Sequence, residues 1–266
     1  SEPLVVLLAV CTLFYLVFQR QELKSKSFKH PIFITISAMF IWAVFVTFFS
    51  TNVFISVKYL LAKSWYLLGF FILPILLLKT KKHFKAFFWC LFIPTFCSVV
   101  YVMIRHGMEK FTFDSITASV QPIYRNHVNY AVFITMLLPF IFLASTWYAK
   151  GSFRKMLLQF SILLFLAAIY FSYTRGAWLA VGAMAVYYFI LRLNATKYVV
   201  IISGIAAISF SIFILKDNNY LKYSPDFEHT IYHDELADHL TSTFEMEDMS
   251  TVERFYRWIA AINLFK

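Results

Sequence analysis

Eight long apolar runs dominate this sequence and limit the folds that are open to it. An apolar helix needs about 20 residues to cross the hydrocarbon core of a bilayer. The shorter runs reach that length by including flanking Tyr, Lys or Arg, whose long side chains bend toward water. We therefore predict an all-α, polytopic transmembrane helical bundle with about eight spans, at 4–18, 32–57, 60–78, 86–104, 128–149, 156–174, 176–191 and 198–215. A long extracytoplasmic loop and the start of an amphipathic helix follow at 216–266.

The composition excludes most classes of soluble protein. Hydrophobic residues make up 61% of the chain and charged residues only 14%, whereas a soluble domain is about 25% charged. The net charge of +10 comes from short clusters of Lys and Arg between apolar runs. That pattern is typical of membrane loops, so we expect the lipid bilayer as a partner and no nucleic acid. The three cysteines form no CxxC pair, and we expect neither a metal nor another cofactor.

Loop charge predicts the side of the membrane that each segment faces, because cytoplasmic loops carry an excess of Lys and Arg. Thirteen of the 24 Lys and Arg residues, with a single acid, lie at 19–31, 79–85, 150–155 and 192–197. The alternating segments at 58–63, 105–127, 175 and 216–266, taken together with the N-terminus, hold the other 11 Lys and Arg residues and the other 13 acids. The first set is therefore expected in the cytoplasm and the second outside. Both ends of the sequence resemble cut ends, so we expect a fragment of a longer protein.

A helical hairpin is expected where Arg175 interrupts the apolar stretch between 156 and 191. Gly176 permits a tight turn or a close backbone approach, and Thr174 is a suitable N-cap for the second helix. The amide groups of a helix start beside a guanidinium make a suitable site for phosphate. The other interpretation is a loop arginine that binds lipid head groups.

A second polar cluster stands at the start of the predicted span 128–149. Its residues are Arg125, Asn126, His127 and Asn129. Polar side chains at the mouth of a membrane cavity often mark a substrate path, which makes these four candidate binding residues. An interfacial polar collar with an aromatic anchor is the alternative.

A third cluster follows the acidic loop. Ser250 and Glu253 have the spacing of a capping box, and apolar residues then recur at helical intervals. Arg254, Arg257 and Trp258 lie on one face of the predicted amphipathic helix, where two guanidiniums can approach an anion. A surface helix with a Glu253–Arg257 ion pair is the alternative. The loop histidines lack the HExxH pattern of a zinc site, which favours a solvated face.

These three clusters resemble, in the same order, the motifs of the O-antigen ligase and O-antigen polymerase superfamily. Residues 172–180, Ser-Tyr-Thr-Arg-Gly-Ala-Trp-Leu-Ala, resemble its S-x-[ST]-R-G-[AG]-x-[LI]-A signature. Residues 125–131, followed by Pro139, resemble its upstream N-x-x-[AY]…P span start. Residues 254–258 resemble its R-x-x-x-W helix, which follows a long outer loop. The resemblance covers about residues 120–266.

The resemblance implies a metal-independent glycan transferase of the bacterial inner membrane. Such enzymes move a polysaccharide from an undecaprenyl-pyrophosphate carrier to lipid A-core or to another glycan during cell-surface polysaccharide biosynthesis. Arg175 and Arg254 match the motif arginines that hold the diphosphate and are the candidate catalytic residues. Arg125, Asn126, His127, Asn129, Gly176, Arg257 and Trp258 are the candidate binding residues.

The sequence departs from the superfamily at its end. The P-x-x-G-x-G motif and the later His-Asn pair of the superfamily fall after the R-x-x-x-W helix, beyond Lys266. We therefore expect the fragment alone to be inactive. Two other classes stay open, namely a membrane transporter or flippase and a non-catalytic membrane sensor. Transporters more often show intramembrane charges and internal repeats, which favours the transferase.

Overall fold

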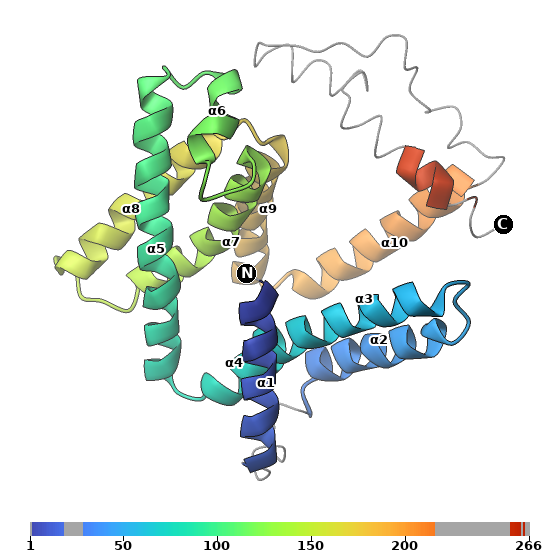
Figure 1. Ribbon diagram of the computed structural model, residues 1–266. Helices are drawn as coiled ribbons and strands as arrows, with labels where there is room; N and C mark the ends of the chain where they lie inside the picture. Colours follow the sequence, from blue (N-terminus) through green and yellow to red (C-terminus); the bar gives the residue numbers. More distant parts are fainter. Residues whose placement is uncertain (1, 19–28, 216–255, 262, 264–266) are drawn as a thin grey trace. The chain divides into compact units, whose positions relative to one another are not determined.

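The computed structural model describes residues 2–18, 29–215, 256–261 and 263, and its regular elements are all helical. The elements are α-helices α1–α10, which are labelled in Figure 1, and one π-helical segment, η3, between α3 and α4. The predicted all-α class is confirmed. The predicted loop 216–254, with its histidines, its capping box and Arg254, lies outside the described residues. The described chain divides into two compact units, Ser1–Leu91 and Phe92–Lys266.

The first unit is built on three helical segments. They are α1 (Glu2–Phe18), α2 (Pro31–Thr47) and a continuous run of α3 (Val53–Leu67), η3 (Leu68–Ile72) and α4 (Leu73–Leu77). Helix α2 packs against α3, and α1 packs against α3 and η3. Gly69 allows this close approach, because a Cβ there would lie 3.1 Å from Cδ2 of Leu8.

The turn between α2 and α3 corrects the prediction. The span 32–57 and the outer loop 58–63 are wrong, since α2 ends at Thr47 and α3 begins at Val53. Asn52 caps α3 by accepting a hydrogen bond from the backbone N–H of Ile55 at 3.2 Å, and the hydroxyls of Ser50 and Ser56 are 2.6 Å apart. The polar residues at 50–52 therefore supply hydrogen-bond acceptors for the free N–H groups at the start of α3. A lysine cannot do this, because its side chain has no acceptor.

Lys58 and Lys63 consequently lie inside α3 rather than in a loop. The helical run Val53–Leu77 has 25 residues and rises about 37 Å, more than the hydrocarbon core of about 30 Å. Its first turns can therefore extend beyond the core. The Nζ of Lys63 lies 5.3 Å from the ring centroid of Tyr59, which is one turn nearer the start of the helix. The Lys63 side chain therefore extends toward the helix end, where a snorkelling lysine reaches water.

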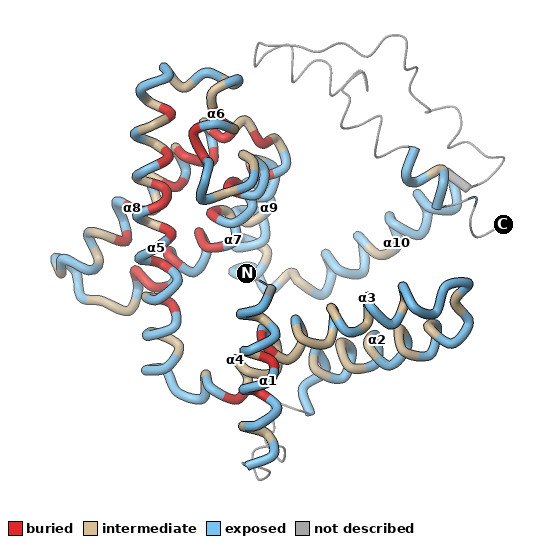
Figure 2. Tube along the Cα trace, in the orientation of Figure 1, coloured by how far each residue is buried: buried red, intermediate tan, exposed pale blue. Residues whose placement is uncertain are grey.

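The second unit contains the part of α5 (Lys81–Met108) from Phe92 onward and five further helices. They are α6 (Phe113–Val120), α7 (His127–Ser145), α8 (Phe153–Tyr170), α9 (Arg175–Arg192) and α10 (Thr196–Leu215). Helix α7 is central, because it packs against α6, α8 and α9. Within this unit the buried side chains gather on α5, α6, α7 and α8, whereas α10 is mostly exposed (Figure 2).

The exposed faces of these helices are apolar, which is the arrangement expected in lipid. Five described helical stretches are long and apolar enough to cross a membrane: Val53–Leu77, Lys81–Met108, His127–Ser145, Phe153–Tyr170 and Thr196–Phe213. Pro3–Phe18 and Pro31–Thr47 are shorter apolar helices. Helix α9 has arginine at both ends and 16 residues between them. Seven of the eight predicted runs each lie mainly within one continuous helical segment, the run 32–57 is divided between α2 and α3, and a full set of eight spans remains a prediction.

Candidate functional site

The hairpin that carries Arg175 forms where the sequence predicts it. Helix α8 ends at Tyr170 and α9 begins at Arg175, so the tip consists of residues 171–174. Nε1 of Trp178 donates to the carbonyl oxygen of Ile169 at 2.9 Å, and its ring stacks on that of Tyr170 at 5.8 Å between centroids. These two contacts join the end of α8 to the start of α9 and fix the direction in which α9 leaves the tip.

Thr174 is the N-cap of α9, but its side chain does not cap the helix. Its Oγ1 donates back to the carbonyl oxygen of Ser172 at 3.2 Å. Its backbone carbonyl accepts from the N–H groups of Ala177 and Trp178, at 2.9 and 3.3 Å. The predicted N-cap position of Thr174 is confirmed, but its side chain makes no capping hydrogen bond. The first amide groups of α9 are not taken by a capping hydroxyl, Arg175 is half-buried, and Gly176 is exposed with open space around its Cα. This helix start can accept an anion.

The segment 105–127 is more ordered than a loop. Helix α5 continues to Met108, and α6 turns the buried side chains of Ile116, Ser119 and Val120 inward. His106 is fully buried, and its Nε2 donates to the carbonyl oxygen of Thr112 at 2.9 Å. The bond from His106 to Thr112 thereby joins the end of α5 to the residue before α6, within the segment 105–127 that the loop charges place outside the membrane.

The α5–α6 connection packs directly on the hairpin tip. The hydroxyl of Tyr173 donates to the carbonyl oxygen of Phe111 at 2.7 Å. The ring of Phe111 stacks on that of Phe171, with centroids 4.3 Å apart. The ring of Phe113 meets that of Tyr173 edge-on at 5.5 Å. Two segments 62 residues apart in sequence therefore form one structural element.

Phe113 also links this element to the second predicted cluster. Its ring meets the imidazole of His127 edge-on at 6.1 Å between centroids. His127 is half-buried, and its Nδ1 lies 3.0 Å from Oγ1 of Thr117 on α6. The structure therefore brings the neighbourhood of Arg175 and that of His127 together through the aromatic rings of Tyr173 and Phe113.

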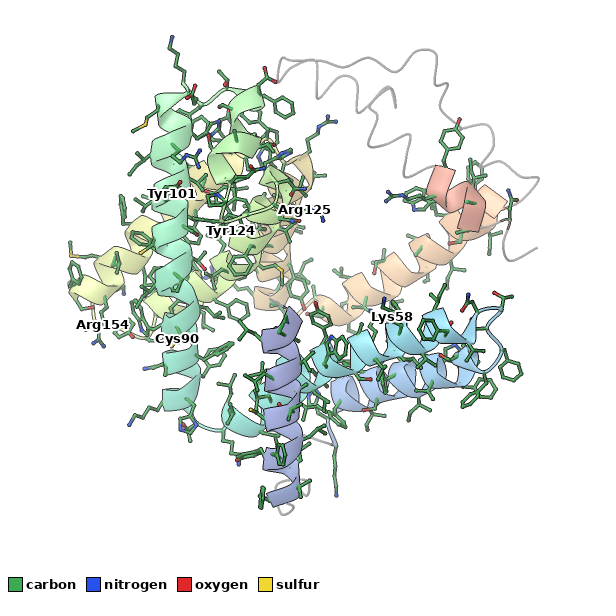
Figure 3. All side chains as sticks on the ribbon, viewed as in Figure 1. Lys58, Cys90, Tyr101, Tyr124, Arg125 and Arg154 are labelled. Carbon is green, nitrogen blue, oxygen red and sulfur yellow. The ribbon has the colours of Figure 1, made fainter. Side chains whose placement is uncertain are left out.

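The other residues of the second cluster have separate positions. Asn126 is the N-cap of α7, and its Oδ1 accepts from the backbone N–H of Asn129 at 2.8 Å. The side chains of Arg125 and Asn129 are exposed. Tyr124, which precedes Arg125 in this turn, is labelled with it in Figure 3. The hydroxyl of Tyr124 lies 2.7 Å from Oγ of Ser98, which ties the turn to α5. A structural role is thus visible for Asn126, and binding by these four residues remains a prediction.

Arg105 supports the same turn from α5. Its guanidinium donates to the carbonyl oxygen of Gln121 and, at 3.1 Å, to the hydroxyl of Tyr101. It also lies over the ring of Tyr101, 5.4 Å from the centroid. The α5 end of the site is therefore held by charge-assisted hydrogen bonds.

Two tyrosines keep their hydroxyl protons over the physiological range. Burial raises the pKa of Tyr173, with a smaller contribution from neighbouring Tyr170. Burial also raises the pKa of Tyr124, which the hydrogen bond to Ser98 partly offsets. Both hydroxyls therefore stay available as donors at neutral pH.

The third predicted cluster is described only in part. Residues 256–261 are helical, as the spacing predicts, and the side chains of Arg257 and Trp258 are exposed. Arg254 lies outside the described residues. The expected convergence of Arg254 with Arg175 and Arg125 therefore remains a prediction.

Sequence reasoning missed the residues that hold the site together. They are His106, Phe111, Phe113, Thr117 and Tyr173. One local signal was present, since Thr112 and the short apolar repeat after it are typical of a helix start. The contact between Tyr173 and Phe111 leaves no trace in a local pattern.

The long apolar helices and their exposed apolar faces define a multi-helical membrane protein. Residues 160–266 match the family model described as O-antigen ligase. The match contains the Arg175 hairpin and the helix at 256–261, whereas the segment 105–139 lies upstream of it. No curated protein and no solved structure matches the chain.

Proposed function

We propose that this protein is an integral membrane glycan transferase of the O-antigen ligase or polymerase type. Its donor is a polysaccharide on an undecaprenyl-pyrophosphate carrier, and its acceptor is lipid A-core or another glycan. It works in the bacterial inner membrane, with the segment 216–254 on the outer side. One observation carries the proposal: the segment that matches the O-antigen ligase family contains a hairpin whose tip offers a helix start, a half-buried arginine and open space at Gly176.

The chemistry follows from the leaving group. In the transfer, the bond between the anomeric carbon and the carrier's phosphate oxygen breaks, and a bond from the acceptor oxygen to that carbon forms. The acceptor loses its proton to a base, and undecaprenyl pyrophosphate leaves with the electron pair. The charge that develops on the diphosphate is stabilised by fixed guanidiniums and amide groups, which is usually the largest catalytic contribution.

We assign Arg175 the contact with the diphosphate, because it lies at the start of α9, where the helix dipole also favours an anion. Arg254 is the second candidate for this contact. Gly176 lets a phosphate oxygen approach the backbone. Arg257 and Trp258 are assigned to donor binding.

The cluster at the start of α7 is assigned to substrate binding. Arg125 and Asn129 present exposed polar groups, and half-buried His127 faces the element that includes the hairpin tip. Asn126 contributes through the cap that orients the first turn of α7. Such groups orient an acceptor hydroxyl relative to the anomeric carbon, which is a large part of the rate enhancement in a two-substrate reaction.

The test uses the protein expressed from its full reading frame and reconstituted in liposomes with an undecaprenyl-pyrophosphate-linked glycan and an acceptor. Arg175→Lys should lower kcat about 100-fold or more, because an ammonium cannot reproduce the bidentate geometry of a guanidinium. Arg192→Lys is the matched control, since Arg192 ends the same helix. Turnover by Arg175→Lys at the wild-type rate would refute the assignment. Movement of the donor across the membrane without transfer would favour a flippase, and neither activity would favour a sensor.

A further inference from the structure

We infer that Tyr173 is a positioning residue that holds the Arg175 hairpin on the α5–α6 connection. The inference rests on the proposed function for its catalytic consequence. Tyr173 lies two residues before Arg175, at the tip between α8 and α9. It acts through the backbone of the tip and touches no substrate in this account.

The geometry of the contact is the first support. The hydroxyl of Tyr173 donates to the carbonyl oxygen of Phe111 at 2.7 Å, a short and well-formed bond. Phe111 and Phe171 stack beside it at 4.3 Å, and Phe113 covers the ring of Tyr173 edge-on at 5.5 Å. The bond is part-buried, and the neighbouring aromatic rings reduce the access of competing water, which strengthens it.

The backbone on both sides of this bond is the second support. Tyr173 has a φ of 52°, and Lys110 and Phe111 have φ values of 55° and 56°. Large L residues rarely adopt this left-handed conformation, and it persists where surrounding contacts hold it in place. Both ends of the bond are thus in uncommon backbone conformations, which contacts such as this one help to hold in place.

The α5–α6 connection is itself held in place by His106. Fully buried His106 donates from Nε2 to the carbonyl oxygen of Thr112, and its backbone carbonyl accepts from the N–H of Phe111 at 2.9 Å. Its ring also meets the ring of Phe111 edge-on at 5.1 Å. Tyr173 is therefore bonded to a fixed partner, so its bond restrains the hairpin tip rather than a free loop.

This arrangement gives Arg175 two restraints that act on opposite sides of it. Trp178 fixes the start of α9 to the end of α8 within the hairpin. Tyr173 fixes the tip to the segment that, through Phe113 and Thr117, also contacts His127. The bond thus sets the position of the arginine relative to the predicted acceptor side of the site.

The position of the tip can be measured without any activity. A cysteine at position 176 would stand in open space, and the native Cys11, Cys90 and Cys97 can be replaced by alanine. In detergent-solubilised full protein, Tyr173→Phe should raise the rate at which Gly176→Cys reacts with a soluble maleimide by about threefold or more, because the tip is released. An unchanged rate would overturn the inference.

The control is Tyr170→Phe. Tyr170 is exposed, its hydroxyl makes no hydrogen bond to another described residue, and phenylalanine keeps the stack on Trp178. This variant should leave the labelling rate unchanged. A rise of equal size in Tyr170→Phe would show that any change near the tip has the same effect, and would also overturn the inference.

The kinetic consequence is measured in protein that keeps Gly176 and its three native cysteines. Tyr173→Phe should lower kcat about tenfold and leave the KM for the lipid-linked donor within about twofold, since the arginine is present but misplaced in the transition state. In the Arg175→Lys background the same substitution should lower kcat by less than about twofold, because the group being positioned is gone. Full additivity of the two substitutions would contradict a role through Arg175.

The two proposals fail in different ways. A wild-type protein that transfers no glycan refutes the proposed function, whereas the maleimide labelling rates still decide whether Tyr173 holds the hairpin. A protein that transfers glycan equally well with Tyr173→Phe keeps the proposed function and loses the inference.

Discussion

The hydrogen bond between Tyr124 and Ser98 should be a measurable part of the stability of the second unit. Ser98 is buried on α5, and its Oγ donates to the carbonyl oxygen of Thr95 at 2.8 Å. The hydroxyl of Tyr124 is therefore the donor in its own 2.7 Å bond to Ser98. This bond ties the turn that carries Arg125 to α5, and removing it tests whether that turn is held by a specific contact.

The magnitude follows from what each substitution leaves in place. Tyr124→Phe keeps the ring, which meets Tyr130 edge-on at 5.1 Å, and removes only the hydroxyl. The net contribution of one hydrogen bond is about 1 kcal/mol in soluble proteins, and interhelical bonds in membrane proteins average about 0.6 kcal/mol. We expect Tyr124→Phe to lower the free energy of unfolding by about 0.6–1 kcal/mol.

The assay is a double-mutant cycle of Tyr124→Phe and Ser98→Ala, with unfolding driven by SDS in mixed micelles and followed by tryptophan fluorescence. Ser98→Ala also removes the bond to Thr95, so only the cycle isolates the pair. The coupling energy should be about 0.6–1 kcal/mol. A coupling energy near zero would refute the tie between the turn and α5.

The pH dependence of this coupling has a defined sign. Burial raises the pKa of Tyr124 above its ordinary value of 10.0. The bond therefore contributes fully below that ordinary value and is lost only as the pH rises through the higher folded pKa. The coupling energy should be the same at about pH 6 and about pH 9. A decline within that interval would contradict the direction of the pKa shift.

Two further predictions concern a helix cap and a helix contact. Asn126→Ala should lower the free energy of unfolding by about 1 kcal/mol through loss of the α7 cap, and Asn126→Asp should restore it. Restored stability without restored turnover would assign the Asn126 amide to substrate binding. Unchanged stability in Asn126→Ala would refute the cap. Gly69→Leu should destabilise the first unit by about 1–3 kcal/mol, because even a Cβ at position 69 would lie 3.1 Å from Leu8. Gly182→Leu is the control, since its side chain meets open space. Equal effects of the two substitutions on SDS-driven unfolding would show that Gly69 is not a close-contact position.

The sequence predicts the helical segments well, because their signal is local. Apolar length alone locates eight helical segments, and the single charge at Arg175 locates the tip of the α8–α9 hairpin. The prediction fails at the turn between α2 and α3, where Lys58 and Lys63 looked like a loop. The turn instead forms at Asn52 and the Ser50–Ser56 pair, because an uncapped helix start in lipid leaves backbone N–H groups without partners. The two lysines need no loop, because a lysine near a helix end reaches water from within a span.

The candidate site divides in the same way into local and long-range parts. Arg175, Gly176 and the start of α9 are predictable, since a motif of nine residues contains them. The restraints on them are not, because Tyr173 bonds to Phe111, 62 residues earlier, and α9 packs on α7. Both partners lie upstream of residues 160–266, which match the O-antigen ligase family. The matched segment therefore contains Arg175 and Gly176 without all of the structure that packs against them, so the candidate site also includes the upstream helices.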